Sequence, residues 1–246
     1  MPNKAFYDMH LHSCLSPCGD DEMTPCNIAG MASVKGLNIV ALTDHNTCGN
    51  CPAFFSACTS LSIVAVPGAE ITTSEDIHVV TLFETLEGAM DFDRFLSTQR
   101  IPFENDPSVF GRQLYMDDSD RIVGEESCLL INAVNISIDD INKIVSRYGG
   151  IAYPAHVDKA SNSITSVFGM IPESDFTAYE ISDVSNLPSF TQMHPAINGK
   201  CIVTSSDAHY LWDINERVNS LEILSDLSDA ESVRRELFSL LRGETK

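Results

Sequence analysis

The stretch A-F-Y-D-M-H-L-H, residues 5–12, joins an apolar run to two histidines that stand two positions apart. An extended chain points alternate side chains the same way, so two imidazoles from one strand can hold one ion. Two later stretches repeat the design, N-I-V-A-L-T-D-H at residues 38–45 and S-I-V-A-V-P-G-A-E at residues 62–70. An apolar strand that ends in titratable side chains is therefore the recurring unit of the chain.

Other segments extend this pattern of strands and helices. Apolar runs predict further strands at residues 77–83, 151–154, 178–181, 202–205 and 220–224. Helical spacing or cap residues predict helices at residues 25–35, 52–60, 86–99 and 138–148, and a last helix that ends near Gly243, capped by Ser228 with Glu231. The turn at residues 117–120 predicts a hairpin. Because strands and helices alternate, we expect a parallel sheet that closes into a barrel in a single domain.

Composition narrows the class of protein. The 246 residues carry a net charge of −20, which argues against a protein that coats nucleic acid. No apolar run approaches the roughly 20 residues that span a bilayer, and the first residues do not resemble a leader peptide. Six of the eight cysteines fall between Cys14 and Cys58. With no export signal we expect reduced thiols and a cytoplasmic protein.

Titratable side chains gather where the predicted strands end. Six of the seven histidines lie there: His10, His12, His45, His78, His156 and His209. Asp44, Glu70 and Asp207 accompany them, and Asp20 follows in the loop after the first strand. Burying so many titratable groups costs several kcal/mol unless they are paired or bind metal. His194 has no such setting, and we interpret it as a surface or packing residue.

Taken in order, H-x-H, D, T-D-H, G-A-E, H, P-A-H and S-D-A-H resemble the motif set of the polymerase-and-histidinol-phosphatase (PHP) family. The motifs span residues 7–210, and the chain looks most like the stand-alone phosphoesterases of that family. The resemblance implies an α/β fold, a distorted (β/α)7 TIM-like barrel. It also implies one domain over residues 1–246, with a small cap-like insertion at about residues 86–148.

The resemblance further implies two or three divalent metal ions in the mouth of the barrel. The ligands carried over are His10, His12, Glu70 and Asp207 for one ion, Glu70, His78 and His156 for a second, and Asp20, His45 and His209 for a third. Asp20 is preferred over Asp21 because it keeps the family's spacing to Thr24-Pro25. Mixed histidine and carboxylate ligands suit manganese, zinc or iron, among which the sequence does not choose.

The function that follows is a metal-dependent phosphoesterase, in which a hydroxide between two ions attacks phosphorus in line. The candidate catalytic residues are Glu70, Asp44 and His209. Asp44 is expected to orient an imidazole or the bridging water. A water or a nearby histidine protonates the leaving oxygen. Lys159, Arg112 and Arg217 are the candidates for binding a distal phosphate.

We expect a small phosphorylated substrate: a nucleoside 3′,5′-bisphosphate or the 5′ end of an oligonucleotide. Neither a membrane nor a stable nucleic-acid complex is expected, and the oligomeric state stays open. One alternative is an amidohydrolase-type C–N hydrolase, although such enzymes usually need a bridging lysine. The other is a non-catalytic metal-binding domain, although all nine ligand positions are filled.

Overall fold

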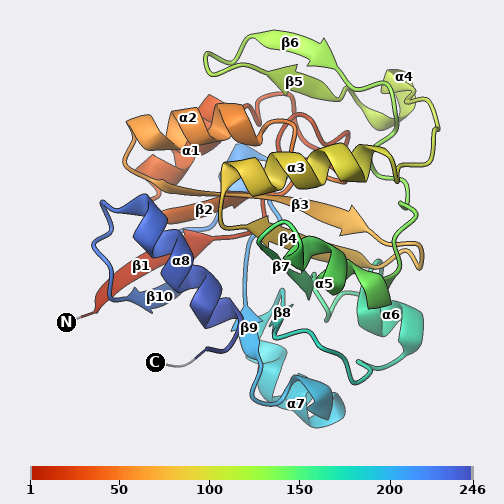
Figure 1. The fold of residues 1–246 in the computed structure, drawn as a ribbon, viewed down its shortest axis with the longest axis vertical. Coiled ribbons are helices and arrows are strands. Elements are labelled where there is room, and N and C mark those ends of the chain that lie inside the picture. Colours follow the sequence, from red (N-terminus) through yellow and green to blue (C-terminus); the bar gives the residue numbers. More distant parts are fainter. Residues whose placement is uncertain (1, 245–246) are drawn as a thin grey trace.

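The computed structural model describes residues 2–244. Its principal sheet has six strands in the order β10-β1-β2-β3-β4-β7 (Figure 1). These strands are β1 (Asn3–Asp8), β2 (Ile39–Leu42), β3 (Val64–Thr72), β4 (His78–Phe83), β7 (Gly150–Pro154) and β10 (Ser220–Ile223). A parallel pair, β8 (Ala178–Glu180) with β9 (Cys201–Val203), and a hairpin, β5 (Leu114–Met116) with β6 (Ile122–Glu125), complete the strands that the structure describes.

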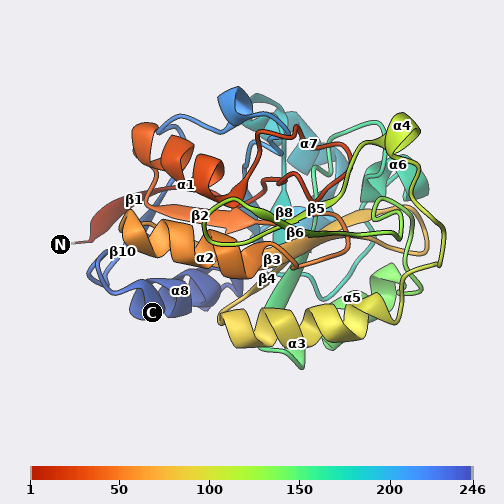
Figure 2. The ribbon, with the colours of Figure 1, turned by 90° about the horizontal axis from the view of Figure 1, so that it is seen from above.

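Five helices stand where the sequence predicts them: α1 (Pro25–Val34), α2 (Cys51–Ser60), α3 (Leu86–Ser97), α5 (Ile138–Ser146) and α8 (Ala230–Leu241). Three short helices were not predicted: α4 (Pro107–Phe110), α6 (Ile164–Phe168) and α7 (Leu187–Met193). Figure 2 shows α3, α5 and α8 along one side of the strands, with α1 on the other. Within residues 2–244, no helix has the length and apolar character needed to cross a bilayer.

Cap residues set the ends of the first and last helices. The Thr24 side chain accepts a hydrogen bond from the amide of Asn27, and Gly36, at φ 71°, follows the end of α1. The predicted cap of the last helix is wrong by one residue, because Asp229 accepts from the amide of Ser232. Ser228 is not free for that role, since its amide and hydroxyl both donate to Asp226.

The prediction of an all-parallel sheet is also wrong. β1, β2 and β3 are parallel, but β4 runs antiparallel to both β3 and β7, and β10 runs antiparallel to β1. The connection from β3 to β4, residues 73–77, is much shorter than the dozen or so residues that a parallel crossover needs. As a result Thr72 pairs with His78, and the start of β4 lies at the edge where β3 ends.

The sheet is curled around a core of its own. Alternate side chains of its strands pack with β8 and β9 in one cluster that includes Ala5, Tyr7, Met9, Ile39, Ala41, Val64, Val66, Val80, Leu82, Ile151, Tyr153, Ala178, Val203 and Ile223. Helix α8 covers this core with Val233, Leu237, Phe238 and Leu241. Arg234 of α8 donates to the carbonyls of Ala65 and Glu84, where β3 begins and β4 ends. The helix therefore closes one end of the curled sheet and leaves the other end for the site.

Residues 86–148 form α3, α4, the β5–β6 hairpin and α5. The hairpin packs on the loop after β1, where the amide of Leu114 donates to the carbonyl of Cys14 over 2.9 Å. Asn50 joins it too, because its side chain accepts from the amide of Met116 and donates to the carbonyl of Leu114. A cap over the substrate remains a prediction for this segment.

Candidate metal centre

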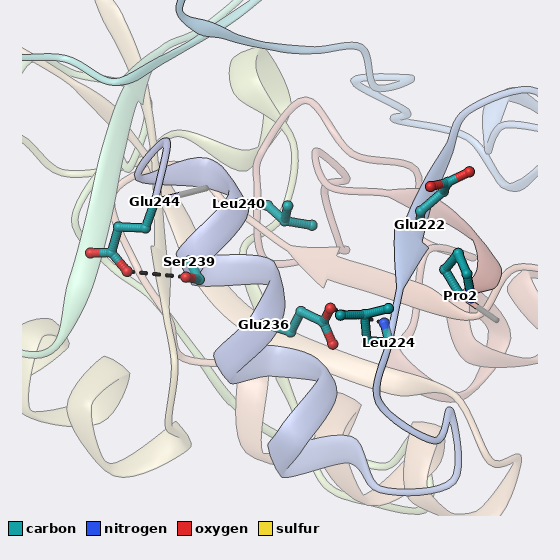
Figure 3. A pocket seen from close by; sticks show the side chains of 7 residues that line it. All are labelled: Pro2, Glu222, Leu224, Glu236, Ser239, Leu240 and Glu244. Carbon is teal, nitrogen blue, oxygen red and sulfur yellow. Dashed lines mark hydrogen bonds between the residues drawn. The ribbon is translucent and has the colours of Figure 1, made fainter. Parts of the chain in front are cut away.

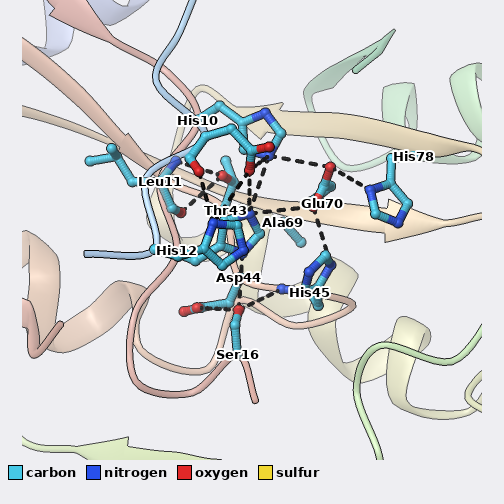
Figure 4. A network of polar contacts seen from close by, with 12 residues as sticks. His10, Leu11, His12, Ser16, Thr43, Asp44, His45, Ala69, Glu70 and His78 are labelled. Carbon is cyan, nitrogen blue, oxygen red and sulfur yellow. Dashed lines mark hydrogen bonds and ion pairs between the residues drawn. The ribbon is translucent and has the colours of Figure 1, made fainter. Parts of the chain in front are cut away.

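Eight of the nine predicted ligands meet at the open end of the curled sheet. Figure 4 shows five of them, His10, His12, His45, Glu70 and His78. His10 and His12 follow β1, His45 follows β2, Glu70 lies in β3, His78 opens β4, His156 follows β7, and Asp207 and His209 follow β9. The antiparallel course of β4 is what places its first residue here. All but three of the eight are buried, and His78, Asp207 and His209 are partly exposed.

Glu70 stands at the centre of the cluster and is only 1% exposed. Its Oε1 lies 2.9 Å from Nδ1 of His78 and 3.2 Å from Nε2 of His156. The same oxygen lies 3.3 Å from Nε2 of His10. Its Oε2 lies 3.1 Å from Nδ1 of His45 and 3.3 Å from Nε2 of His12. Five imidazoles from four segments of the chain thus surround one carboxylate.

This crowding fits bound divalent cations better than hydrogen bonds alone. A carboxylate offers about four acceptor positions, fewer than the five ring nitrogens around Glu70. The Nε2 atoms of His10 and His12 face each other at 3.3 Å. Nδ1 of His45 is buried without a hydrogen bond, although it is close to Glu70. Converging nitrogen and oxygen donors of this kind are the ligands that manganese, zinc and iron share.

The donor atoms form three groups, in each of which they lie within 4.8 Å of one another: His10, His12, Glu70 and Asp207; Glu70, His78 and His156; and His12, His45 and His209. The first two groups have the same members as the predicted ligand sets. The third contains His12 in place of Asp20. The Asp20 side chain instead accepts from the amide of Glu22, while its own amide donates to the carbonyl of His209 over 2.9 Å.

The pKa values of the buried histidines shift in opposite directions, upward at His10 and His12 and downward at His45. Burial would lower the pKa of His12, but the hydrogen bonds that its ring donates to the carboxylates of Asp207 and Glu70 raise it to about 9. Burial likewise opposes a higher pKa at His10, yet the nearby carboxylates hold it well above its usual range. For His45, burial prevails and the pKa falls well below the ordinary value.

Glu70 itself is held as an anion. Burial alone would raise the pKa of its carboxyl, but the surrounding imidazoles, His78 foremost, keep that pKa well below the usual range. A permanently charged carboxylate at the centre of the cluster is suited to bridging two cations.

Two ligands sit in strained backbone conformations. His156 has φ 31° and Asp207 has φ 54°, in a region that costs non-glycine residues about 1–3 kcal/mol. Each is held by a bond of its amide: His156 donates to Glu180 over 3.0 Å, and Asp207 donates to the carbonyl of His10 over 2.9 Å. Such strain is typical of positions that serve a function.

Asp44 lies behind the ligands rather than among them. Its carboxylate accepts from the amide and hydroxyl of Ser13, at 2.7 and 2.6 Å, and from the hydroxyl of Ser16 at 2.7 Å. The hydroxyl oxygen of Ser16 is 3.0 Å from Nδ1 of His12 and can accept a hydrogen bond from it. The Ser16 hydroxyl thus links the Asp44 carboxylate to the His12 ring, and the orienting role of Asp44 stays a prediction.

Sequence reasoning did not single out Ser13, Ser16 or Glu180. The Glu180 carboxylate lies 2.9 Å from Nδ1 of His10 and is 2% exposed. Its position was visible as a carboxylate at the end of the predicted strand 178–181, the same signal that marked Glu70. The serines carry no comparable signal, because hydroxyl residues are common in loops.

A cavity of about 150 Å³ opens onto the cluster and is lined by His45, Glu70, His78, His156, Lys159, Ser161, Asn162, Asp207 and His209. Lys159 brings a cation to it, with Nζ 2.6 Å from Oδ2 of Asp207. The other two predicted phosphate ligands have other partners in the structure, and their contact with a phosphate stays a prediction. Arg112 pairs with Glu125 at 3.2 Å, and the Arg217 guanidinium lies 4.1 Å from the centre of the Phe6 ring.

Another cavity, between β10 and α8, has the wrong charge for a phosphate. It measures about 220 Å³, and Glu222, Glu236 and Glu244 stand among its lining residues (Figure 3). Three carboxylates without a cation among the lining residues would repel an anionic ligand. The cluster around Glu70 is therefore the better candidate for phosphate chemistry.

Comparisons with known proteins place these features in context. A family model described as PHP domain matches residues 8–183. A 5′-3′ exoribonuclease of Haemophilus influenzae is 33% identical over 79 residues, which is 31% of this chain and 28% of that protein. The chain therefore spans less than a third of this curated relative.

Two solved structures share the fold. A protein of Bifidobacterium adolescentis described as a metal-dependent phosphoesterase aligns with a TM-score of 0.59 and 16% identity, over 97% of both chains. The lesion-specific endonuclease of Pyrococcus furiosus aligns with a TM-score of 0.56 and 18% identity, over 85% of this chain and 49% of its own. At these identities the likeness concerns the fold.

Proposed function

The chain belongs to the PHP domain family, and from that premise we propose that it is a metal-dependent hydrolase of phosphoric esters that acts on a small phosphorylated nucleotide. The substrate is a nucleoside 3′,5′-bisphosphate or the 5′ end of a short oligonucleotide. One observation carries this proposal: a cavity of about 150 Å³ combines the ligand cluster with the cation of Lys159. Such a space admits a phosphate group more readily than a long duplex. The similarity to part of an exoribonuclease also supports a nucleotide.

We propose that Glu70 bridges the two groups of which it is a member, the one with His10, His12 and Asp207 and the one with His78 and His156. His45 and His209 serve a third position, with Asp20 after a change of side-chain rotamer. Manganese, zinc and iron all suit this donor set. When bound, such ions supply Lewis acidity and lower the pKa of water.

Side chains of the protein bind the substrate and orient the ligands. Lys159 meets a distal phosphate, a charge-assisted contact worth about 1.5–3 kcal/mol. Asp44 keeps Nε2 of His12 directed at the cluster through Ser16. Burial lowers the pKa of His209 to about 4, so at pH 7 its ring is neutral and suited to binding metal. We therefore assign protonation of the leaving oxygen to water rather than to His209.

For the fold, we propose that β1, β2, β3, β4, β7, β8 and β9 are the seven strands of a distorted barrel. Their shared core supports this, as does the bridge between Leu11 and Ala208, which links the segment after β1 to the segment after β9. We also propose that the hairpin in residues 86–148 limits the size of the substrate. A cytoplasmic location stays a prediction.

An amidohydrolase-type reaction is less well supported. Glu70 occupies the bridging position, where those enzymes usually place a modified lysine. The lysine that lines the cavity, Lys159, points its Nζ at Asp207 over 2.6 Å, the geometry of a charged ammonium. A modified lysine would carry no such charge.

The test is a substrate panel with the manganese-loaded chain. It contains nucleoside 3′,5′-bisphosphates, 5′-phosphorylated oligonucleotides, histidinol phosphate, phosphodiesters and amide substrates. We expect phosphate release from the nucleotide members, abolished by a chelator. Hydrolysis of histidinol phosphate alone would refute the proposed substrate class, and hydrolysis of amides alone would refute phosphoesterase chemistry here.

A further inference from the structure

We propose that Glu180 is a positioning residue that aligns ligands of two different ion groups through one carboxylate oxygen. The inference rests on the same metal centre as the proposed function, but it does not depend on which substrate is hydrolysed. Glu180 ends β8 and is 2% exposed. A buried carboxylate is costly unless strong partners compensate for its lost hydration, so its contacts need an explanation.

The first contact of Glu180 holds the imidazole ring of His10 in one orientation. Oε2 of Glu180 lies 2.9 Å from Nδ1 of His10, and Oε1 lies 3.2 Å from the same nitrogen. Because a carboxylate only accepts hydrogen bonds, Nδ1 of His10 must carry the proton. With that proton held at Nδ1, Nε2 is the nitrogen left to bind an ion, and it faces the cluster 3.3 Å from Oε1 of Glu70. Glu180 therefore selects the ring nitrogen of His10 that can bind an ion.

The second contact of Glu180 holds the backbone turn at His156 and Val157. The amide of His156 donates to Oε2 of Glu180 over 3.0 Å, and the amide of Val157 donates to the Glu180 carbonyl over 2.8 Å. His156 is the ligand with φ 31°, a conformation that persists only where neighbouring contacts enforce it. Glu180 thus accepts hydrogen bonds from this strained turn with both its side chain and its backbone carbonyl.

These contacts link the two groups a second time, because Glu70 already belongs to both. His10 belongs to the group with His12, Glu70 and Asp207, whereas His156 belongs to the group with Glu70 and His78. The two ligands follow different strands, β1 and β7. Since Oε2 makes both contacts, moving this single atom displaces one ligand of each group. Partners behind the ligands commonly change metal affinity by about 10–100-fold.

The decisive variant is Glu180→Gln, which keeps the size of the side chain. In a glutamine the negative charge is lost and one of the two oxygens becomes an NH2 donor. If the remaining oxygen stands in the place of Oε2, the NH2 group faces Nδ1 of His10 over about 3.2 Å, and if the amide is flipped, the NH2 group faces both His10 and the His156 amide. Glu236→Gln is the matched control. Glu236 is also buried, at 8% exposure, and accepts from the amides of Leu224 and Ser225 at 2.9 Å each, at the closed end of the sheet.

The measurement is Mn²⁺ binding to the chelator-stripped full chain, by calorimetry and with no substrate present. We expect Glu180→Gln to weaken binding about 10–100-fold at two sites, while Glu236→Gln binds as the unchanged chain does. Nitrogen NMR of the chain loaded with diamagnetic Zn²⁺ should also show that His10 loses its fixed Nδ1 proton only in the Glu180 variant. If Glu180→Gln does not fold, Glu180→Asp is used, which keeps the charge but is too short to hold both contacts.

Unchanged Mn²⁺ affinity in a folded Glu180 variant would overturn the inference. So would an equal loss in the Glu236 variant, because that result would mean general destabilisation. Weakening at one site only would refute the claim that one oxygen serves two groups. Since no substrate enters the measurement, an enzyme inactive on nucleotides would refute the proposed function and leave this result intact.

Discussion

The sharpest perturbation of the site is Glu70→Gln. The change keeps the shape of the side chain but removes the charge around which five imidazole nitrogens gather within 3.3 Å. The new amide group would also point hydrogens at some of those nitrogens. Removing one partner from a buried charged pair costs about 3–5 kcal/mol.

We expect the loss of this carboxylate to weaken ion binding by a similar free energy, which at 1.36 kcal/mol for each factor of ten is roughly 100-fold to a few thousand-fold in metal affinity. Because Glu70 belongs to two of the three donor groups, two ions should be affected and turnover should be abolished.

The assay pairs the metal content of the purified chain, by elemental analysis, with phosphate release at increasing Mn²⁺. Glu236→Gln again serves as the control for the loss of a buried carboxylate away from the site. We expect the Glu70 variant to be depleted of metal and inactive while the control retains both properties. Retained turnover with full metal content would refute the bridging role of Glu70.

Three further predictions concern neighbouring residues. Lys159→Ala should raise KM by roughly tenfold to a hundredfold, since a charge-assisted contact is worth about 1.5–3 kcal/mol, and steady-state kinetics with an unchanged KM would count against that contact. Asp44→Asn should destabilise the chain by about 1–3 kcal/mol in denaturant unfolding, because an amide cannot accept everything that Ser13 and Ser16 donate. The pKa of His12, raised to about 9, means that its ring carries a proton at pH 7 in the metal-free chain. Metal binding should therefore release protons and strengthen as pH rises from 7 to 9, and calorimetry in buffers of different ionisation enthalpy should detect that release.

The positions of the clustered histidines and carboxylates could be predicted from the sequence because these residues stand at the ends of apolar strands. Each ligand stands at a boundary between an apolar run and a polar loop, so its rough location follows from the pattern of burial. Glu180 carries the same mark and was overlooked only because glutamate at a strand end is common. Its role depends on His10 and His156, which are distant in sequence and meet it only in the folded chain.

The direction of β4 could also have been predicted. The gap between the predicted strands at residues 62–70 and 77–83 has no room for a helix, and a short connection favours an antiparallel pair. By contrast, the partners of Arg112 and Arg217 could not be predicted. Glu125 and Phe6 reach them through the path of the hairpin and of the segment before β10, which leave no local trace in the sequence.

Asp20 shows that motif spacing can select a residue without predicting the direction of its side chain. Family spacing selects it as a ligand, but spacing does not fix a rotamer, and its carboxylate accepts from the nearby amide of Glu22 instead. Its backbone nevertheless lies beside His209, because its amide donates to that residue's carbonyl. The place of Asp20 in the third donor group therefore stays a prediction.

The most direct test of the central claim is a metal titration of the chelator-stripped chain, with the rate of phosphate release from a nucleoside 3′,5′-bisphosphate and the bound metal measured in the same samples. We predict no activity in the stripped chain, a rise as ions fill the donor groups around Glu70, and a plateau at two or three ions per chain. A chain that binds its full complement of ions and releases no phosphate, or one that releases phosphate while stripped, would contradict the account.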